Sequence, residues 1–269
     1  MLILNGELKE VEDSDIINGE IKIPDGVTSI GKKAFYKSSL TSVIIPDSVT
    51  SIGDGAFYSC SSLTSVTIPG SVTSIGAGAF YSCRSLTSII IPDSVTLIGD
   101  EAFSTCSSLT SIIIPDSVTS IGRFAFNCCD SLTSIIIPES VTFIGDDAFR
   151  CYTKVSAIHI RATTKKDYDR ILSMLPEGIQ QRIQNQLREA YEFLLERIRP
   201  LLADTKDSIG FFNKGKIPFE LTTKIIGNLA EQYNIPKFMA DSVAEKFNNN
   251  SQSMDDKPEH NDVIQYLPM

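Results

Sequence analysis

The chain has 269 residues, of which 42% are hydrophobic and 21% are charged, and its formal net charge at pH 7 is −9. This length and composition are typical of one or two folded domains with an ordinary core. The negative charge argues against nucleic acid and anionic membranes as partners, because both select basic surfaces. No apolar run has the length of a membrane-spanning helix, so membrane insertion is not expected.

The first ten residues have neither the cationic start nor the apolar core of a secretory signal. Six cysteines in such a chain favour reduced thiols in a cytosol. The expected location is therefore the cytoplasm of the producing cell. Delivery into a host cell without a cleavable signal peptide is the alternative.

Residues 1–20 differ from the regular part that follows them, and we interpret them as an N-terminal cap. Asn5-Gly6 is typical of the two-residue turn of a hairpin. Apolar residues of this segment stand among acidic ones, for example Leu2, Leu4, Leu8 and Val11. Such an atypical first unit covers the apolar end that a stack of repeats leaves open.

A repeat of 23 residues occupies residues 21–162, in about six units. Its prolines stand at Pro46, Pro69, Pro92, Pro115 and Pro138. Its Ala-Phe pairs end at Phe57, Phe80, Phe103, Phe126 and Phe149. A fixed period in this range predicts a solenoid, in which each unit contacts mainly its two neighbours.

Two short extended segments are predicted within each unit. The alternation in 109–114 predicts a strand with Ile112 and Ile114 pointing inward and Ile113 outward. Residues 118–122 predict a second, shorter extended piece that ends at a glycine. A helical or 3-10 turn then places Phe126 inside the coil.

The repeated pattern LxxIxIPxxVxxIGxxAFxxC, clearest from Leu86 to Cys106 and from Leu109 to Cys129, resembles the BspA-type leucine-rich repeat. The resemblance covers residues 21–162. It implies a leucine-rich-repeat solenoid with short parallel strands, turns and 3-10 helices, and a protein-binding role. The family includes bacterial surface adhesins, protozoan surface proteins and effectors injected into host cells, so a bacterial effector that binds a host protein is one expectation. The resemblance names no ligand.

The outward strand positions form the candidate binding face. One column contains Ile44, Thr67, Ile90, Ile113, Ile136 and His159. The acidic residues that follow the prolines are Asp47, Asp93, Asp116 and Glu139. An exposed isoleucine stripe with an acidic rim is typical of a protein-binding surface. Two alternatives stay open: β-branched residues suit strands for their own sake, or the C-terminal helices cover the stripe.

The cysteines predict neither a metal site nor a cofactor site. Four of them recur at the repeat period, at Cys60, Cys83, Cys106 and Cys129. A file of sulfurs does not converge on one point as metal ligands do, so we interpret these residues as small buried hydrophobes. Cys128 and Cys151 stand one position earlier and are expected to be more exposed. The adjacent pair Cys128-Cys129 is a candidate for redox chemistry.

No catalytic motif is present, and the two histidines, His159 and His260, stand far apart in the chain. We therefore expect no enzymatic activity.

Residues 163–248 predict a helical domain. Its first helix is capped by Thr163 or Thr164 and ends before Pro176, and the stripe in 177–199 predicts a long amphipathic helix. Two more helices are expected at 218–233 and 236–247, each opened by a proline. Residues 249–269 are polar and are expected to be disordered.

One segment of the helical domain resembles the core LPxELxxxIxxxL of F-box domains, which dock onto the adaptor of a cullin ubiquitin ligase. The matching residues are Ile217, Pro218, Glu220, Leu221, Ile225 and Leu229. In F-box proteins this motif usually precedes the repeats, whereas here it follows them. The resemblance implies an alternative function as a ubiquitin-ligase adaptor.

Overall fold

A computed structural model describes residues 1–151, 157–187, 189, 224, 226–228, 230 and 235–250. The chain divides into two units, Met1–His159 and Ile160–Met269.

The first unit begins with the predicted hairpin. Strand β1 (Leu2–Leu4) pairs antiparallel with β2 (Glu7–Glu10). Asn5 and Gly6 have φ values of 52° and 78°, which are the positive angles that a type I′ turn needs. β2 then pairs in parallel with β4 (Ser29–Ile30), and Leu8 is fully buried there. The hairpin therefore supplies the first layer of the stack, followed by the short 3-10 helix Asp13–Asp15.

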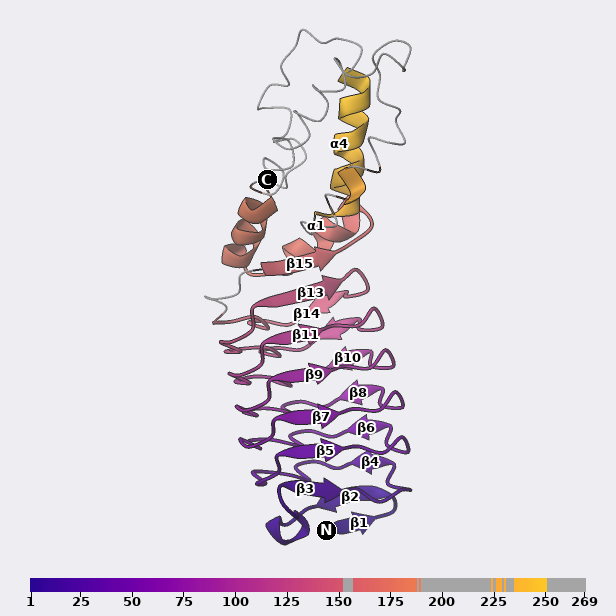
Figure 1. The fold of residues 1–269 in the computed structure, drawn as a ribbon, viewed down its shortest axis with the longest axis vertical. Helices are drawn as coiled ribbons and strands as arrows, with labels where there is room; N and C mark the ends of the chain where they lie inside the picture. Colours follow the sequence, from indigo (N-terminus) through magenta and orange to yellow (C-terminus); the bar gives the residue numbers. More distant parts are fainter. Residues whose placement is uncertain are drawn as a thin grey trace. The chain divides into compact units, whose positions relative to one another are not determined.

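Each coil contributes one strand of three or more residues to the first face of the solenoid (Figure 1). A three-stranded sheet contains β3 (Glu20–Lys22), β5 (Ser42–Ile44) and β7 (Ser65–Thr67). A four-stranded sheet contains β9 (Ser88–Ile90), β11 (Ser111–Ile113), β13 (Ser134–Pro138) and β15 (Ala157–Arg161). Pairs such as Ile112 with Ile135 are parallel and join equivalent positions of neighbouring coils. The predicted parallel solenoid is confirmed.

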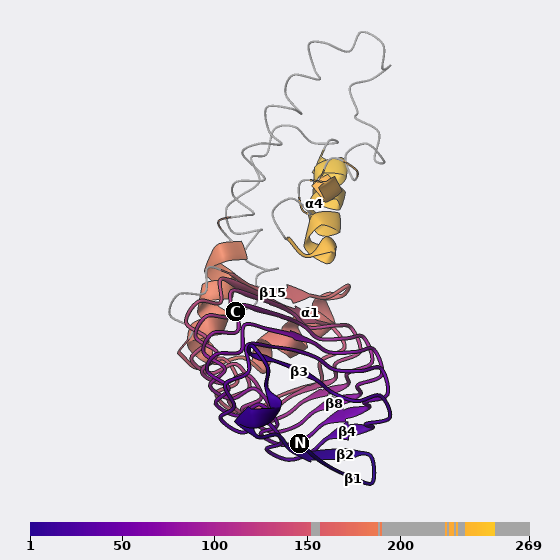
Figure 2. The ribbon, with the colours of Figure 1, turned by 60° about the horizontal axis from the view of Figure 1, so that its bottom comes forward.

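The second extended piece of each coil forms a continuous sheet of eight strands on the other face. After β1, β2 and β4 it contains β6 (Ser51–Ile52), β8 (Ser74–Ile75), β10 (Leu97–Ile98), β12 (Ser120–Ile121) and β14 (Phe143–Ile144). Figure 2, turned toward the N-terminal end, shows the outlines of successive coils lying over one another.

The third side of each coil is a chain of turns that bonds to the next coil through its backbone. The N–H groups of Glu101, Phe103 and Thr105 donate to carbonyls of the next coil at 2.7, 2.8 and 2.7 Å. Glu101 and Thr105 have φ values of 58° and 62°. The sequence predicts a helical or 3-10 turn here, whereas the structure shows a series of turns. Residues with positive φ are interspersed among other residues, so every second N–H points toward the neighbouring coil and not back along a helix.

The core is a stack of phenylalanine rings with aliphatic side chains around it. The six rings belong to Phe35, Phe57, Phe80, Phe103, Phe126 and Phe149, and all are at most 1% exposed. Successive centroids lie between 4.7 and 5.7 Å apart, and the planes are within 11° of parallel. Every coil therefore buries the same ring against the next one, as the repeat predicts.

The glycine of each coil is required by close packing of backbones. A Cβ atom on Gly122 would lie 2.4 Å from the amide nitrogen of Asp100 in the preceding coil. Gly76, Gly99 and Gly145 show the same conflict, at 2.7, 2.7 and 2.5 Å. Any side chain here would force successive coils apart.

The second unit contains α1 (Lys165–Ser173), a helical stretch at 177–187, and α4 (Lys237–Asn250). Thr164 caps α1, as predicted, and its Oγ1 accepts a hydrogen bond from the amide of Asp167 at 3.1 Å. Tyr168 and Phe238 meet edge to face at 5.6 Å, so α1 and α4 contact each other. No helix among the described residues is long and apolar enough to cross a membrane.

The remaining helix predictions are described only in part. Residues 177–187 and 189 are helical within the predicted helix 177–199, and residues 224, 226–228 and 230 are helical within 218–233. α4 runs to Asn250, so the first two residues of the segment 249–269 are helical, and the others lie outside the described residues.

Candidate functional site

The predicted outward column lies on the first face of the solenoid, and we call it the isoleucine column. Alternation along each strand turns its members away from the core, because successive side chains of a strand point to opposite sides. Ile44, Ile90 and Ile113 are 72%, 80% and 68% exposed, and Thr67 is exposed as well. Ile136 and His159 are half-buried.

Pairing in register brings these residues side by side. Ile113 lies between Ile90 and Ile136 in the four-stranded sheet, and Ile44 pairs with Thr67 in the three-stranded sheet. Ile44 also pairs with Lys22, which extends the column by one position and which sequence reasoning missed. The signal was available, since Lys22 stands two residues before Pro24 just as Ile44 stands two residues before Pro46.

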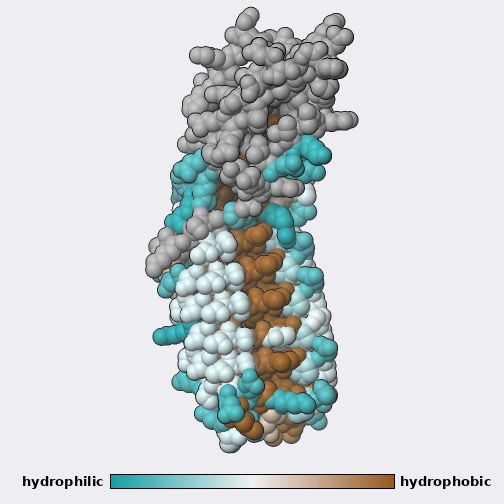
Figure 3. Space-filling view, viewed as in Figure 1, coloured by the Kyte–Doolittle hydropathy of each residue, from teal (hydrophilic) through white to brown (hydrophobic). Residues whose placement is uncertain are grey.

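The surroundings of the isoleucine column are polar. Figure 3 shows a hydrophobic stripe along this face, with surface of intermediate hydropathy on one side and hydrophilic surface on the other. The neighbouring strand positions are serines such as Ser88 and Ser111, and both are exposed. The four predicted acidic residues are all exposed, namely Asp47, Asp93, Asp116 and Glu139. The face therefore combines an apolar stripe with an acidic edge.

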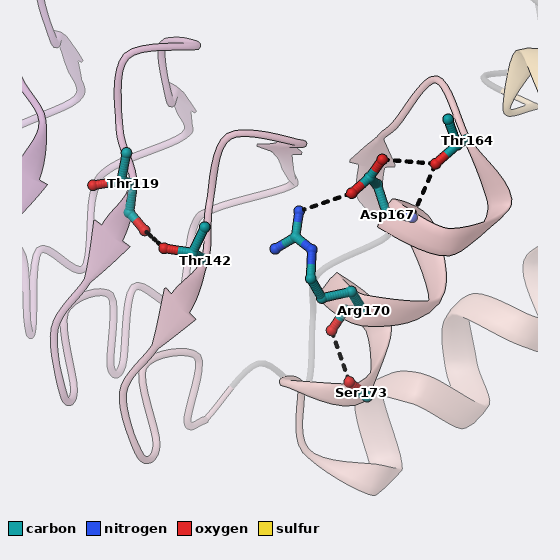
Figure 4. A network of polar contacts seen from close by, with 6 residues as sticks. All are labelled: Thr119, Thr142, Thr164, Asp167, Arg170 and Ser173. Atoms are coloured by element: carbon teal, nitrogen blue, oxygen red, sulfur yellow. Dashed lines mark hydrogen bonds and ion pairs between the residues drawn. The ribbon is translucent and has the colours of Figure 1, made fainter.

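The face of the eight-stranded sheet has a different outward column, which we call the threonine column. Its members are Thr28, Thr50, Thr73, Thr96, Thr119 and Thr142, and all are exposed. The hydroxyls of Thr50, Thr73, Thr119 and Thr142 donate to the carbonyl of the equivalent threonine in the preceding coil, and that of Thr28 donates to Gly6 O. Thr142 Oγ1, for example, donates to Thr119 O at 3.1 Å (Figure 4). Figure 4 also shows the cap that Thr164 and Asp167 form on α1.

Two apolar residues interrupt the serines beside the threonine column. Leu97 is 44% exposed and Phe143 is 54% exposed, at positions where other coils have Ser74 or Ser120. Sequence reasoning did not single them out, although aligning the coils shows both substitutions.

The four cysteines at the repeat period are buried, as predicted, and each thiol is used inside the core. Cys83, Cys106 and Cys129 donate to the carbonyls of Phe57, Phe80 and Phe103, each at 3.1 Å. Burial holds the pKa of the Cys83 and Cys106 thiols well above the usual range and raises the pKa of Cys129 to about 12. These sulfurs are therefore protonated hydrogen-bond donors, not nucleophiles.

The pairing of Cys128 differs from the expected one. Its sulfur lies 2.7 Å from that of Cys151 in the next coil, whereas its sequence neighbour Cys129 turns into the core. Among the described residues no three metal-ligating side chains gather at one point.

Of the two histidines and the F-box-like residues, the structure describes only His159. Burial lowers the pKa of His159, and His260 lies outside the described residues. The F-box-like residues Ile217, Pro218, Glu220, Leu221, Ile225 and Leu229 also lie outside the described residues.

Comparison with known proteins gives one family match and several similar structures. Residues 16–90 and 73–177 match the model of the BspA type leucine rich repeat region, in six copies. These ranges together span more than half of the chain. No curated protein matches it.

Three solved structures illustrate the likeness. The T. pallidum leucine-rich repeat protein TpLRR is 32% identical over 47% of this chain and 68% of its own, with a TM-score of 0.43. A leucine-rich cell surface protein from Faecalibacterium prausnitzii is 37% identical over 54% of this chain and 46% of its own, with a TM-score of 0.41. The pneumococcal vaccine antigen PcpA is 21% identical over 63% of this chain and 42% of its own, with a TM-score of 0.51, a likeness of fold alone.

Proposed function

This chain belongs to the BspA-type leucine-rich repeat family, and on that basis we propose that it is a non-catalytic module that binds a protein through the isoleucine column. The observation that carries the proposal is the exposure of Ile44, Ile90 and Ile113 at 72%, 80% and 68%. Exposed isoleucines aligned along one face lose contact with water only when another molecule covers them.

The chemistry of the face indicates what kind of surface would fit it. An apolar ridge on the partner would lie along the isoleucine column and bury its side chains. Lysine or arginine residues beside that ridge would meet the acidic edge, where Asp47 and Asp93 are exposed. The apolar contact supplies most of the affinity, whereas the charges orient the partner and raise the association rate.

Matched variants of the full chain test this proposal. The face variant carries Ile90→Asp, Ile113→Asp and Ile136→Asp, and the control carries Thr96→Asp and Thr119→Asp on the face of the eight-stranded sheet. Each protein is immobilised and exposed to a eukaryotic lysate, and the retained proteins are identified by mass spectrometry. We expect a protein that the wild type and the control retain and that the face variant loses.

Two further measurements make the outcome decisive. Circular dichroism establishes that all three proteins keep the same fold. Retention by the wild type and control should weaken at higher salt, because exposed charges are screened. Identical retention by the wild type and the face variant would contradict the proposal.

A second part of the proposal concerns the cell in which the partner protein is found. The family resemblance extends to effectors, so we place the partner in a host cell. A bacterial lysate, used in parallel, tests this part separately. A partner retained only from the bacterial lysate would contradict the host-cell assignment and leave the binding face intact.

A further inference from the structure

One column of equivalent residues on the turn side of the solenoid contains cysteine in two successive coils. Every member has a positive φ, between 53° and 68°, and the members are Lys37, Ser59, Ser82, Thr105, Cys128 and Cys151. The four earlier members carry an amine or a hydroxyl, whereas the last two carry thiols. Cys128 and Cys151 are therefore the two cysteines of the chain that stand outside the buried file.

The stacking of coils holds these two residues together. The backbone N–H of Cys128 donates to the carbonyl of Arg150 at 3.1 Å, as the equivalent residue does in each earlier coil. Neighbouring strands stack about 4.8 Å apart, which lies within the Cα separation of about 4.4 to 6.8 Å that disulfides allow. The two sulfurs are 2.7 Å apart, so no atom lies between them.

The two thiols also differ from the others in access. Cys151 is exposed and Cys128 is half-buried, whereas Cys60, Cys83, Cys106 and Cys129 are buried. A dissolved disulfide can therefore reach Cys151 and then Cys128, but not the file in the core.

We propose that Cys128 and Cys151 form a modification site, a dithiol that closes to a disulfide between neighbouring coils by exchange with an oxidised small-molecule disulfide such as oxidised glutathione. The exposed Cys151 loses its proton and attacks one glutathione sulfur, which forms a mixed disulfide and releases one reduced glutathione. Cys128 then loses its proton and attacks the sulfur of Cys151. The mixed disulfide breaks, and the second reduced glutathione leaves with the second proton.

The order of attack agrees with the environment of Cys128. Its hydrogen bond to Cys151 and its partial burial raise the pKa of Cys128 to about 11, so it is a thiol at neutral pH. Only a thiolate attacks a disulfide, so Cys128 suits the second step, in which the mixed disulfide holds the target sulfur beside it and offsets the small thiolate fraction. The product would tie two coils together across a loop of 23 residues.

Peptide mapping of the full chain tests the proposal. Trypsin cleaves after Arg123, Arg150 and Lys154, so Cys128 and Cys129 fall in peptide 124–150 and Cys151 falls in peptide 151–154. After incubation of the folded protein with oxidised glutathione, we expect two of the six thiols to be lost. We also expect the two peptides to be joined, and dithiothreitol should separate them.

The variants Cys128→Ser and Cys151→Ser identify the bond. Both should abolish the link, although Cys129 remains in peptide 124–150, and the buried thiols should stay unreactive in both as evidence of folding. A link that survives Cys128→Ser, a bond within peptide 124–150, or glutathione adducts that never resolve into a link would each overturn the proposal.

Discussion

The two faces of the solenoid are built from the same coils, yet their outward columns differ. Both faces carry a column of threonines just before their strands, and hydroxyls of these columns donate to the preceding coil, as Thr119 does to Thr96 O at 3.3 Å and Thr110 does to Thr87 O at 3.1 Å. Only the first face adds an outward column of isoleucines within its strands. There Ile90 and Ile113 are 80% and 68% exposed. Thr67 fills a position of the isoleucine column within β7, so threonine, which is β-branched like isoleucine, suits this outward strand position as well. Strand propensity alone therefore does not explain exposed isoleucine, which supports a binding role for that face.

The largest effect is expected from the interior that both faces share. Phe103 is fully buried, and its ring lies 5.3 Å from that of Phe80 and 5.5 Å from that of Phe126. Phe103→Ala leaves a cavity in this stack and should lower the free energy of unfolding by about 3–5 kcal/mol. Urea denaturation followed by circular dichroism measures the change. A loss below about 1 kcal/mol would contradict the continuous ring stack.

A smaller loss should follow from separating two coils at a glycine. A Cβ atom on Gly99 would lie 2.7 Å from the amide nitrogen of Ala77, so Gly99→Ala should cost about 1–3 kcal/mol of unfolding free energy. Gly70→Ala is the control, because a Cβ atom there meets no atom within 4 Å. The control should be neutral or stabilising by up to about 1 kcal/mol. Equal losses in both variants would refute the close-approach explanation.

The threonine column can be tested by removing one hydroxyl at nearly constant shape. Thr119→Val loses the donor to Thr96 O and should lower the unfolding free energy by about 0.5–1.5 kcal/mol. Thr119→Ser keeps a hydroxyl and should recover part of the loss. If valine is as stable as threonine in a thermal melt, the hydroxyl bonds do not explain why threonine fills this column.

The reciprocal change on the isoleucine column should leave stability nearly unchanged. Ile113→Thr alters a side chain that is 68% exposed, so the unfolding free energy should change by no more than about 0.5 kcal/mol. Retention of the partner should nevertheless fall. A marked loss of stability without loss of retention would assign the isoleucine to folding and not to binding.

The smallest effect concerns pH. Burial lowers the pKa of His159 from its usual 6.5, so the folded state favours the neutral ring. Its contribution to stability is present above the pKa of the unfolded chain and is lost as the pH falls from that value through the lower pKa of the folded chain. His159→Thr should therefore lose less stability than the wild type between about pH 7.5 and pH 5. Identical pH dependence in the two melts would show that His159 does not contribute.

The period of the sequence predicted most of the solenoid because each coil buries the same residues. Proline spacing and alternation identified the strands of the first face, and Asn5-Gly6 identified the terminal hairpin. The turn side was harder to predict, because its left-handed positions are occupied by Gly78 in one coil and by Glu101 and Phe124 in others. Hydrogen bonds to the next coil fix that conformation, so no single residue type marks it.

The repeat period also predicted most of the candidate sites, but we did not apply it to Cys128. The repeat period aligned the isoleucine column correctly, and it also placed the buried cysteines in a file. For Cys128 we considered the sequence neighbour Cys129 instead of the residue one period away, Cys151. The period would have found the pair, since residues 23 apart contact each other in successive coils, as Thr119 and Thr142 do.

Because the coils stack in register, the number of repeat units sets the length of the first face. Adding or deleting one 23-residue unit would lengthen or shorten the first face by about 4.8 Å, the spacing of neighbouring strands. The end layers and every remaining contact between coils would stay as they are. A duplication or deletion in the gene could thus fit the protein to a longer or shorter target while its chemistry is preserved.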